Sequence, residues 1–382
     1  MEFTYTALQE QVREEIARFA KKELSPGARE RDRDQSFDRG LFLKCGEMGI
    51  TGLPIPEDYG GSGLDPLSTA IALEAFGYGC EDGGLVFAVC AHLLACTIPI
   101  WKYGTDEQRS KYLGELASGR MIAVNTMTES ESGSDAFTMK STALRDGSGY
   151  RINGVKTFSS NGPVADVAVV YAATDTAKGY YGGISVFIVE AGTPGFSPGQ
   201  KYEKMGLRSC PIGEMIFDDV YVDESCMLGQ PGAGTAIFGD SMSWERVCIA
   251  ASHLGTMNRL LERAINYARV RSSSGQKIGK YQAVSHKIAD MKIALESARL
   301  LTYKAASRLD VARDVALDAS MVKVLVSESL VKTAMDTLQI LGGYGFMTEY
   351  DVERTLRDSV GGTLYSGTNE VQRNIIAKWL GL

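Results

Sequence analysis

The hydrophobic pattern of this 382-residue chain changes its period twice, and these changes limit the folds that the chain can adopt. Up to about residue 120, apolar residues recur at intervals of three or four positions, as Leu8, Val12 and Ile16 do at intervals of four, which is typical of helices. Apolar and polar residues then alternate, and the helical period returns near residue 233. The sequence therefore predicts a helical domain, a β domain and a helical bundle, at residues 1–120, 121–232 and 233–382.

The middle part predicts a small β-barrel or sandwich. Residues 150–158 contain Asn153-Gly154, the dipeptide most typical of a tight hairpin, so we expect a turn there. Further strands are expected at residues 167–171, 184–189 and 215–222. The resulting α+β fold lacks the strand–helix alternation of a Rossmann fold, and no Gly-x-Gly-x-x-Gly follows a strand. A bound dinucleotide would need another mode of binding.

Charge and composition exclude several classes of protein. The net charge of −7 disfavours nucleic acid and anionic membranes as partners. The N-terminus lacks a basic stretch followed by an apolar run, and we expect no apolar window of the roughly 20 residues that a bilayer requires. Seven cysteines without metal-ligand spacing predict reduced thiols, no metal site and a cytoplasmic location. Of three histidines, His92 and His253 lie in apolar helical segments and are expected to be packed residues, which disfavours a histidine-based triad.

Three groups of motifs follow one another along the chain. The first is Met127-Thr-Glu-Ser-Glu-Ser-Gly-Ser-Asp135, which alone would indicate a polar surface loop. The second is Phe158-Ser-Ser-Asn161, where the phenylalanine alone would indicate a core residue. The third is spread over the C-terminal part: Arg271, Gln282, Gln339-Ile-Leu-Gly-Gly343 and Thr368-Asn-Glu370. Together these motifs resemble the acyl-CoA dehydrogenase family over essentially the whole chain.

This resemblance implies a bound FAD and a homo-oligomer, most simply a homotetramer. It places two sets of residues on the cofactor, one from the β domain and one from the bundle, and it implies that the arginine and the Gly-Gly backbone of the bundle come from a neighbouring subunit. The first set is Met127, Thr128, Gly133, Ser134, Phe158 and Ser160, and the second is Arg271, Gln282, Gln339, Gly342, Gly343, Thr368 and Glu370. An arginine and open glycine amides suit a pyrophosphate. The family's usual Arg-x-x-Phe-Gly reads Arg271-Ser-Ser-Ser274-Gly275 here, so one aromatic contact is missing.

The catalytic base must be a carboxylate that removes the α-proton of an acyl thioester while hydride leaves the β-carbon. Most members of the family carry it in Tyr-Glu-Gly-Thr, but this chain reads Tyr365-Ser-Gly-Thr368, and Ser366 cannot be that base. A minority, typified by isovaleryl-CoA dehydrogenase, place it before an arginine on a bundle helix. Glu245 and Arg246 match that pair, although a helical glutamate alone is usually solvated. We therefore predict Glu245 as the base, Arg246 as a residue that orders the site, and the backbone amide of Ser366 as a donor to the thioester carbonyl.

Four further stretches resemble one branch of the family, the prolyl-carrier-protein dehydrogenases of pyrrole and antibiotic biosynthesis. They lie at residues 84–92, 207–211, 241–246 and 365–368. This resemblance implies L-proline on the phosphopantetheine arm of a peptidyl carrier protein, oxidised toward a pyrrolyl thioester. A short- or branched-chain acyl-CoA dehydrogenase and a non-catalytic flavin-binding scaffold remain alternatives. The electron acceptor is either an electron-transfer flavoprotein or oxygen.

Overall fold

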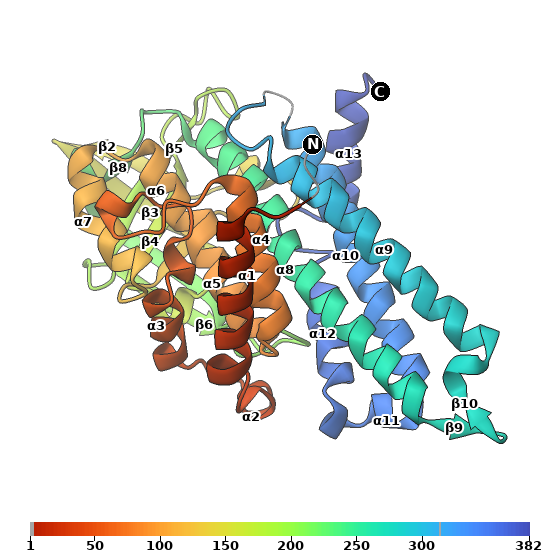
Figure 1. Ribbon diagram of the computed structural model, residues 1–382. Helices are drawn as coiled ribbons and strands as arrows, with labels where there is room; N and C mark the ends of the chain where they lie inside the picture. The colour runs from red at the N-terminus through yellow and green to blue at the C-terminus, as the bar shows by residue number, and fades with distance from the viewer. Residues whose placement is uncertain (1–3, 313–314) are drawn as a thin grey trace.

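The computed structural model describes residues 4–312 and 315–382 as three consecutive parts (Figure 1). Helices form the first part, a sheet forms the middle part, and long helices extend away from both in the last part. This order confirms the predicted α+β fold class.

Side-chain caps set the start of most N-terminal helices. Asp38, Asp65 and Asp82 each accept a hydrogen bond from the backbone amide three residues ahead, as Thr6 and Thr105 also do. Two prolines and paired glycines separate the third and fourth helices, as the sequence predicts. The helices are α1 (Ala7–Phe19), α2 (Ala28–Asp34), α3 (Arg39–Glu47), α4 (Pro66–Gly79), α5 (Gly83–His92), α6 (Ile98–Tyr103) and α7 (Asp106–Ala117).

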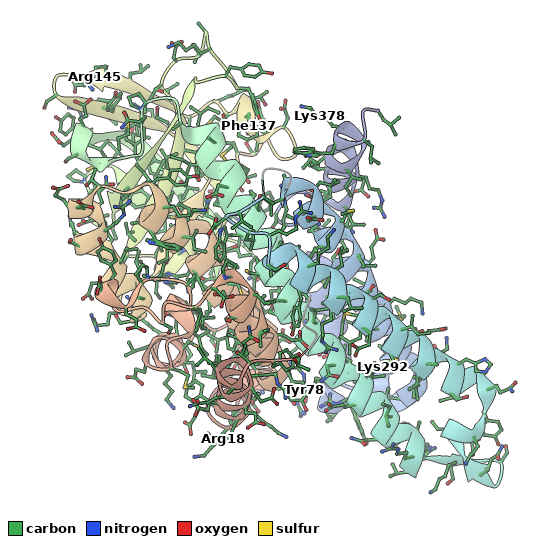
Figure 2. All side chains as sticks on the ribbon, turned by 45° about the horizontal axis from the view of Figure 1, so that its top comes forward. Arg18, Tyr78, Phe137, Arg145, Lys292 and Lys378 are labelled. Carbon is green, nitrogen blue, oxygen red and sulfur yellow. The ribbon has the colours of Figure 1, made fainter. Side chains whose placement is uncertain are left out.

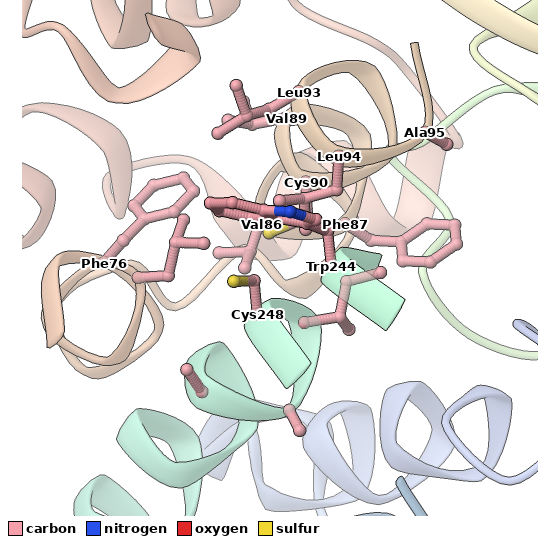
Figure 3. Close-up of a cluster of buried hydrophobic side chains, with 14 of the residues drawn as sticks. Phe76, Val86, Phe87, Val89, Cys90, Leu93, Leu94, Ala95, Trp244 and Cys248 are labelled. Atoms are coloured by element: carbon pink, nitrogen blue, oxygen red, sulfur yellow. The ribbon is translucent and has the colours of Figure 1, made fainter. Parts of the chain in front are cut away.

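The stretch from α5 to α6 contradicts one expectation from the sequence. Gly83–Tyr103 spans 21 residues, and its most apolar window has a mean hydropathy of 2.0, so the stretch is long and apolar enough to cross a membrane. The rest of the protein buries 89% of its most apolar window. Figure 3 shows why: Val86, Phe87 and Cys90 lie among side chains that include Phe76 and Trp244. A helix that is covered on all sides in the core must be apolar all round.

The middle part is one hydrogen-bonded sheet of eight strands. Their order is β6-β7-β3-β2-β4-β5-β8, and β1 pairs in parallel with β4. The strands predicted at residues 167–171, 184–189 and 215–222 are confirmed as β4, β5 and β7. The bounds are β1 (Ala123–Thr126), β2 (Thr142–Asp146), β3 (Gly149–Ser160), β4 (Val167–Ala173), β5 (Ile184–Glu190), β6 (Phe196–Lys201), β7 (Ile212–Asp223) and β8 (Met227–Leu228).

The hairpin predicted at Asn153-Gly154 is wrong. Both residues lie inside β3, at a bulge in its pairing with β7. Gly154 adopts a φ of +150°, and a Cβ there would lie 2.1 Å from Ser141 Oγ. The actual turn consists of Gly147 and Ser148, because Asp146 pairs with Gly149. An Asn-Gly dipeptide supplies the backbone freedom that both a turn and a bulge require, so it does not distinguish them.

In the C-terminal part, the described residues form three long α-helices and three shorter ones. The helix α8 (Gly234–Val270) leads into a short hairpin of β9 (Ser272–Ser273) and β10 (Gln276–Lys277). The chain then returns along α9 and α10 in a bundle (Figure 1). The remaining helices are α9 (Gln282–Ala306), α10 (Val315–Leu341), α11 (Gly343–Phe346), α12 (Val352–Gly361) and α13 (Asn369–Trp379).

Glycines allow α4 and α8 to pack with their backbones in contact. A Cβ at Gly77 would lie 1.9 Å from Ser252 O, and one at Gly255 would lie 2.0 Å from Glu74 O. The guanidinium of Arg259 on α8 also donates to the carbonyls of Gly77 (2.5 Å), Tyr78 (2.8 Å) and Cys80 (3.0 Å) at the end of α4. This contact joins the first part of the chain to the helix that carries Glu245.

We predict that Gly255→Ala destabilises the protein by about 1–3 kcal/mol or more, because the added methyl group overpacks two touching backbones. Gly239→Ala on the same helix is the control, since a Cβ there meets nothing within 4 Å. This control should be neutral or gain about 0.5–1 kcal/mol from helix propensity. Urea unfolding of both variants measures the difference, and equal stabilities would contradict the proposed close packing.

Candidate active site

Glu245 lies on α8 with its side chain turned into the protein, and the residue is only 8% exposed. Trp244 beside it is buried and donates from Nε1 to Asp310 Oδ1 over 3.1 Å. Lys102 of α6 forms ion pairs with Asp310 and Asp240, which fixes this segment of α8 against the first part of the chain. The structure therefore places Glu245 in the interior, unlike most helical glutamates.

The three predicted catalytic residues lie together. The hydroxyl of Ser366 donates a hydrogen bond to Glu245 Oε1, and Arg246 Nε donates to the backbone carbonyl of Ser366 over 3.0 Å. Burial raises the pKa of Glu245, and the Ser366 hydroxyl and the charge of Arg246 offset part of this rise. Burial also lowers the pKa of Arg246 to about 10. A buried carboxylate with a raised pKa is suited to accept a proton near neutral pH. The role of the Ser366 backbone amide stays a prediction.

An aromatic cavity of about 40 Å³ adjoins this group. Phe87 of α5 packs on Tyr365 with ring centroids 4.5 Å apart, and the Tyr365 hydroxyl lies 2.8 Å from His253 Nε2. Burial lowers the pKa of His253 to about 4, so the ring is neutral at neutral pH. Burial raises the pKa of Asp358, which also lines the cavity, to about 7. Tyr365 directly precedes Ser366 in the chain, whereas Glu245 and Ser366 themselves are not among the residues that line this cavity.

A buried ion pair holds the loop that begins at Met127. Lys156 of β3 is fully buried, and its Nζ lies 2.9 Å from Glu129 Oε1 and 3.2 Å from Met127 O. The same carboxylate accepts hydrogen bonds from the amides of Lys140 (2.6 Å) and Ser141 (2.9 Å). Burial alone would raise the pKa of Glu129, but Lys156 and these donors keep it below its usual range. The pair fixes both ends of the loop against β3.

The predicted flavin-binding residues of this loop and of β3 differ in exposure, and Met127 is buried. Gly133 and Ser134 are exposed, and a Cβ at Gly133 would meet nothing within 4 Å. Thr128 is partly buried, and its carbonyl accepts from the Thr157 amide over 2.8 Å. Phe158 is 66% exposed at a φ of +52°, a conformation that bulky residues rarely adopt. Ser160, partly buried, ends the same strand. An open loop beside an exposed aromatic ring fits a planar cofactor such as a flavin.

Most bundle residues of the second predicted set lie at the ends of the long helices, near α11 and the β9–β10 hairpin. Arg271 is exposed at the end of α8, with its guanidinium 5.8 Å from the ring centroid of Tyr344. Gly342 and Gly343 directly precede Tyr344 in the chain and are exposed, and a Cβ at either glycine would meet nothing within 4 Å. Gln339 and Gln282 are also exposed, near the start of α11 and at the start of α9.

These residues and the β-domain loop occupy opposite ends of the molecule. In Figure 1, α11 and the β9–β10 hairpin lie at the lower right, whereas the sheet lies at the upper left. Figure 2 shows the same separation between Arg145 of the sheet and Lys292 of α9. One copy of the chain therefore does not bring both sets together around one flavin.

Thr368 and Glu370 have a local role in the structure. The hydroxyl of Thr368 accepts from the Val371 amide over 3.3 Å and caps α13. Glu370 is exposed in the first turn, where backbone amides lower its pKa. Helix capping accounts for these hydrogen bonds. The contact of Thr368 and Glu370 with a cofactor stays a prediction.

Sequence reasoning missed several residues of the site. Glu129, Lys156, Phe87 and Gln372 were not selected, and His253 was expected to be only a packed residue. His253 is indeed buried, but it also contacts Tyr365. A signal existed for Lys156, since plain alternation from Tyr150 and Ile152 places a lysine on the same inward face of the strand 150–158.

We predict that Lys156→Met costs about 3–5 kcal/mol of stability, because it leaves the Glu129 carboxylate buried without its partner. It should also weaken retention of the flavin, because the loop loses its anchor. Lys140→Met is the control: the Lys140–Glu131 pair is exposed and worth about 0–1 kcal/mol. Urea unfolding and flavin absorbance after gel filtration measure both effects. Equal losses in the two variants would contradict this role of the pair.

Comparisons with known proteins agree with this geometry. Models of the N-terminal, middle and C-terminal domains of acyl-CoA dehydrogenase match residues 6–120, 125–220 and 232–381. An L-prolyl-[peptidyl-carrier protein] dehydrogenase from Pseudomonas fluorescens is 43% identical over the full length of both chains. The crystal structure of the prolyl acyl carrier protein oxidase AnaB shares 41% identity and a TM-score of 0.97, covering 99% of this chain and all of that one. PigA, solved with FAD and proline, shares 40% identity and a TM-score of 0.97 over the full length of both chains. The chain belongs to the acyl-CoA dehydrogenase family.

Proposed function

We propose that this protein is an FAD-dependent dehydrogenase that oxidises L-proline held as a thioester on a peptidyl carrier protein. One observation carries the catalytic part: Glu245 is a buried carboxylate hydrogen-bonded to Ser366, the residue at the position of the family's usual base. The substrate part rests on the prolyl-specific relatives and on the four stretches that resemble that branch.

Each residue of the site has a separate role in the proposed reaction. Glu245 removes the α-proton of the prolyl thioester, and its raised pKa makes it a stronger base than a solvated glutamate. Arg246 holds the Ser366 carbonyl and thereby the loop opposite the base. Bound FAD would accept the hydride that leaves the β-carbon. The open loop at Gly133 and the exposed Phe158 would lie along that cofactor.

The position of the predicted flavin residues supports a homo-oligomer, for which we propose a homotetramer. The β-domain loop and the Arg271–Gly343 end of the bundle are far apart in one chain (Figure 1). Each flavin site would therefore combine the loop of one copy with the bundle end of another. This arrangement accounts for exposed glycines and an exposed arginine at the tip of a bundle.

The alternatives differ in what the site would accept. The pantetheine arm is common to coenzyme A and carrier proteins, so a short- or branched-chain acyl-CoA dehydrogenase would use the same Glu245. A non-catalytic scaffold would have no need for a buried, hydrogen-bonded carboxylate at this point.

We also propose a cytoplasmic location and a choice between two electron acceptors. All seven cysteines are free thiols and six are buried, as expected in a reducing compartment. An electron-transfer flavoprotein is the acceptor expected of the family, and oxygen is the acceptor implied by a relative that is called an oxidase. Reoxidation of the bleached flavin by air alone, compared with an added electron-transfer flavoprotein, distinguishes the two.

We predict that Glu245→Gln lowers the rate of flavin bleaching by at least about 100-fold, since general-base catalysis contributes about 10²–10⁴-fold and the amide cannot accept the proton. Glu262→Gln on the same helix is the control, because the Glu262 carboxylate accepts hydrogen bonds from Tyr78 and Asn258, both outside the site. In the unchanged protein, the rate should fall as the pH drops through the raised pKa of Glu245. Stopped-flow absorbance under anaerobic conditions measures each rate. Full activity of Glu245→Gln would refute the assignment.

For the substrate, we predict that prolyl-loaded carrier protein bleaches the flavin and that butyryl-, isovaleryl- and free prolyl-CoA do so far more slowly. The reason is that docking of the carrier adds binding energy remote from the reacting atoms. The unloaded carrier serves as the control. Fast bleaching by butyryl-CoA or isovaleryl-CoA, with none by the prolyl carrier, would assign the protein to acyl-CoA oxidation instead.

A further inference from the structure

The residue at position 366 remains in contact with the base although it cannot be the base. Its hydroxyl donates to Glu245 Oε1 across a sequence separation of 121 residues. Side chains at positions 245 and 366 therefore reach the same place in the structure, so a glutamate at either position could put its carboxylate there. The serine has not simply left a gap where the usual base would stand.

Backbone contacts fix the loop at Ser366 and thereby orient the Ser366 hydroxyl toward Glu245. Ser366 adopts a φ of +57°, in the left-handed region that serine rarely occupies. Its carbonyl accepts from Arg246 Nε over 3.0 Å and from Gln372 Nε2 over 3.1 Å. Gln372 Nε2 also donates to the Gly367 carbonyl over 3.0 Å, and a Cβ at Gly367 would lie 2.7 Å from that nitrogen. Two side chains from two helices thus hold the peptide that carries the hydroxyl.

Few other charges compete for the Glu245 carboxylate. On its own helix, Arg246 is the neighbouring cation. The ionisable groups that face it from other elements are Cys90 and Cys96 from the α5–α6 stretch, Tyr171 from β4 and Tyr365. Burial raises the pKa of each of these thiols and phenols, so they stay neutral at neutral pH. Ser366 is the group outside α8 from which the carboxylate accepts a hydrogen bond in the described part of the chain.

We propose that Ser366 is a positioning residue: its hydroxyl orients the Glu245 carboxylate and stabilises the ionised form that accepts the α-proton. This inference rests on the proposed function of Glu245 as the base. A hydrogen bond to the charged form favours that form, and the effect is large where water is excluded. The position of the usual base has thus become the partner of the relocated base.

The test uses the FAD-loaded oligomer and compares Ser366→Ala and Ser366→Gly, which both remove the hydroxyl, with Ser366→Asn. Asparagine tolerates a positive φ and supplies an amide donor. Ser118→Ala is the matched control, because the Ser118 hydroxyl bonds Glu115 O at the end of α7, outside the site. Two quantities are measured against pH: the anaerobic bleaching rate with prolyl carrier, and the infrared carboxyl band of the resting enzyme, assigned with Glu245→Gln.

Ser366→Ala and Ser366→Gly should move the titration of Glu245 upward by about one pH unit, as expected for loss of a hydrogen bond to a charged group. Below the midpoint, the bleaching rate should therefore fall about tenfold relative to the unchanged protein, and the difference should narrow at high pH. Ser366→Asn should recover part of the shift, and Ser118→Ala should show none.

A merely structural role would lower the rate by one factor at every pH and leave the infrared titration of Glu245 in place. That result would overturn the inference. If the prolyl carrier fails to bleach the unchanged enzyme, the proposed substrate fails, and the infrared titration still decides the role of Ser366. If Glu245→Gln stays active, the base assignment fails together with this role.

Discussion

The contact between α4 and α8 determines where the chemistry can occur. Gly77 and Gly255 allow the two backbones to touch, and Arg259 binds three carbonyls at the end of α4. The same helix also packs against the apolar α5–α6 stretch, and Glu245 is buried rather than directed to solvent. The raised pKa of the base follows from this burial. A packing constraint some ten residues along the helix thus supports the reactivity of a carboxylate.

The proposed base, Glu245, illustrates how one reaction centre can be supplied from two chain positions. The reaction requires a carboxylate at one point, and it does not specify which helix or loop provides the carboxylate. Because Ser366 Oγ reaches Glu245 Oε1, the loop at 366 and the helix at 245 converge on that point. Moving the glutamate to α8 places it on a rigid element, whereas the loop position depends on Arg246 and Gln372 to hold its peptide. A small hydroxyl-bearing residue at 366 leaves space for the glutamate and supplies a donor to it.

The sequence could predict the elements of the fold because local periodicity determines them. The helices and the strands β4, β5 and β7 follow from apolar spacing of 3.6 and 2 residues. The Asn153-Gly154 turn was wrong because the pairing of β3 with β7 made that dipeptide a bulge. The Gly83–Tyr103 stretch was overlooked as an apolar span, and only tertiary packing shows what covers it. Glu129 and Lys156 lie 27 residues apart, and each alone is typical of a solvated surface, so no local pattern predicts their pairing.

The candidate site was predictable where the motifs are specific, and its geometry was not. Glu245 and Ser366 were selected because the base of the family is found at one of these two positions or at the other. That comparison uses residue types and says nothing about the distance between the two side chains. Their hydrogen bond depends on a loop held at a positive φ by Gln372, which no motif indicated. The same limit applies to the flavin residues: the motifs select Gly133 and Arg271 alike, but the fold places them at opposite ends of one chain (Figure 1). This separation is the reason for proposing that a second copy brings its bundle end to the loop. The burial of Glu245, in contrast, needs no second copy, because the residues of one chain leave it only 8% exposed.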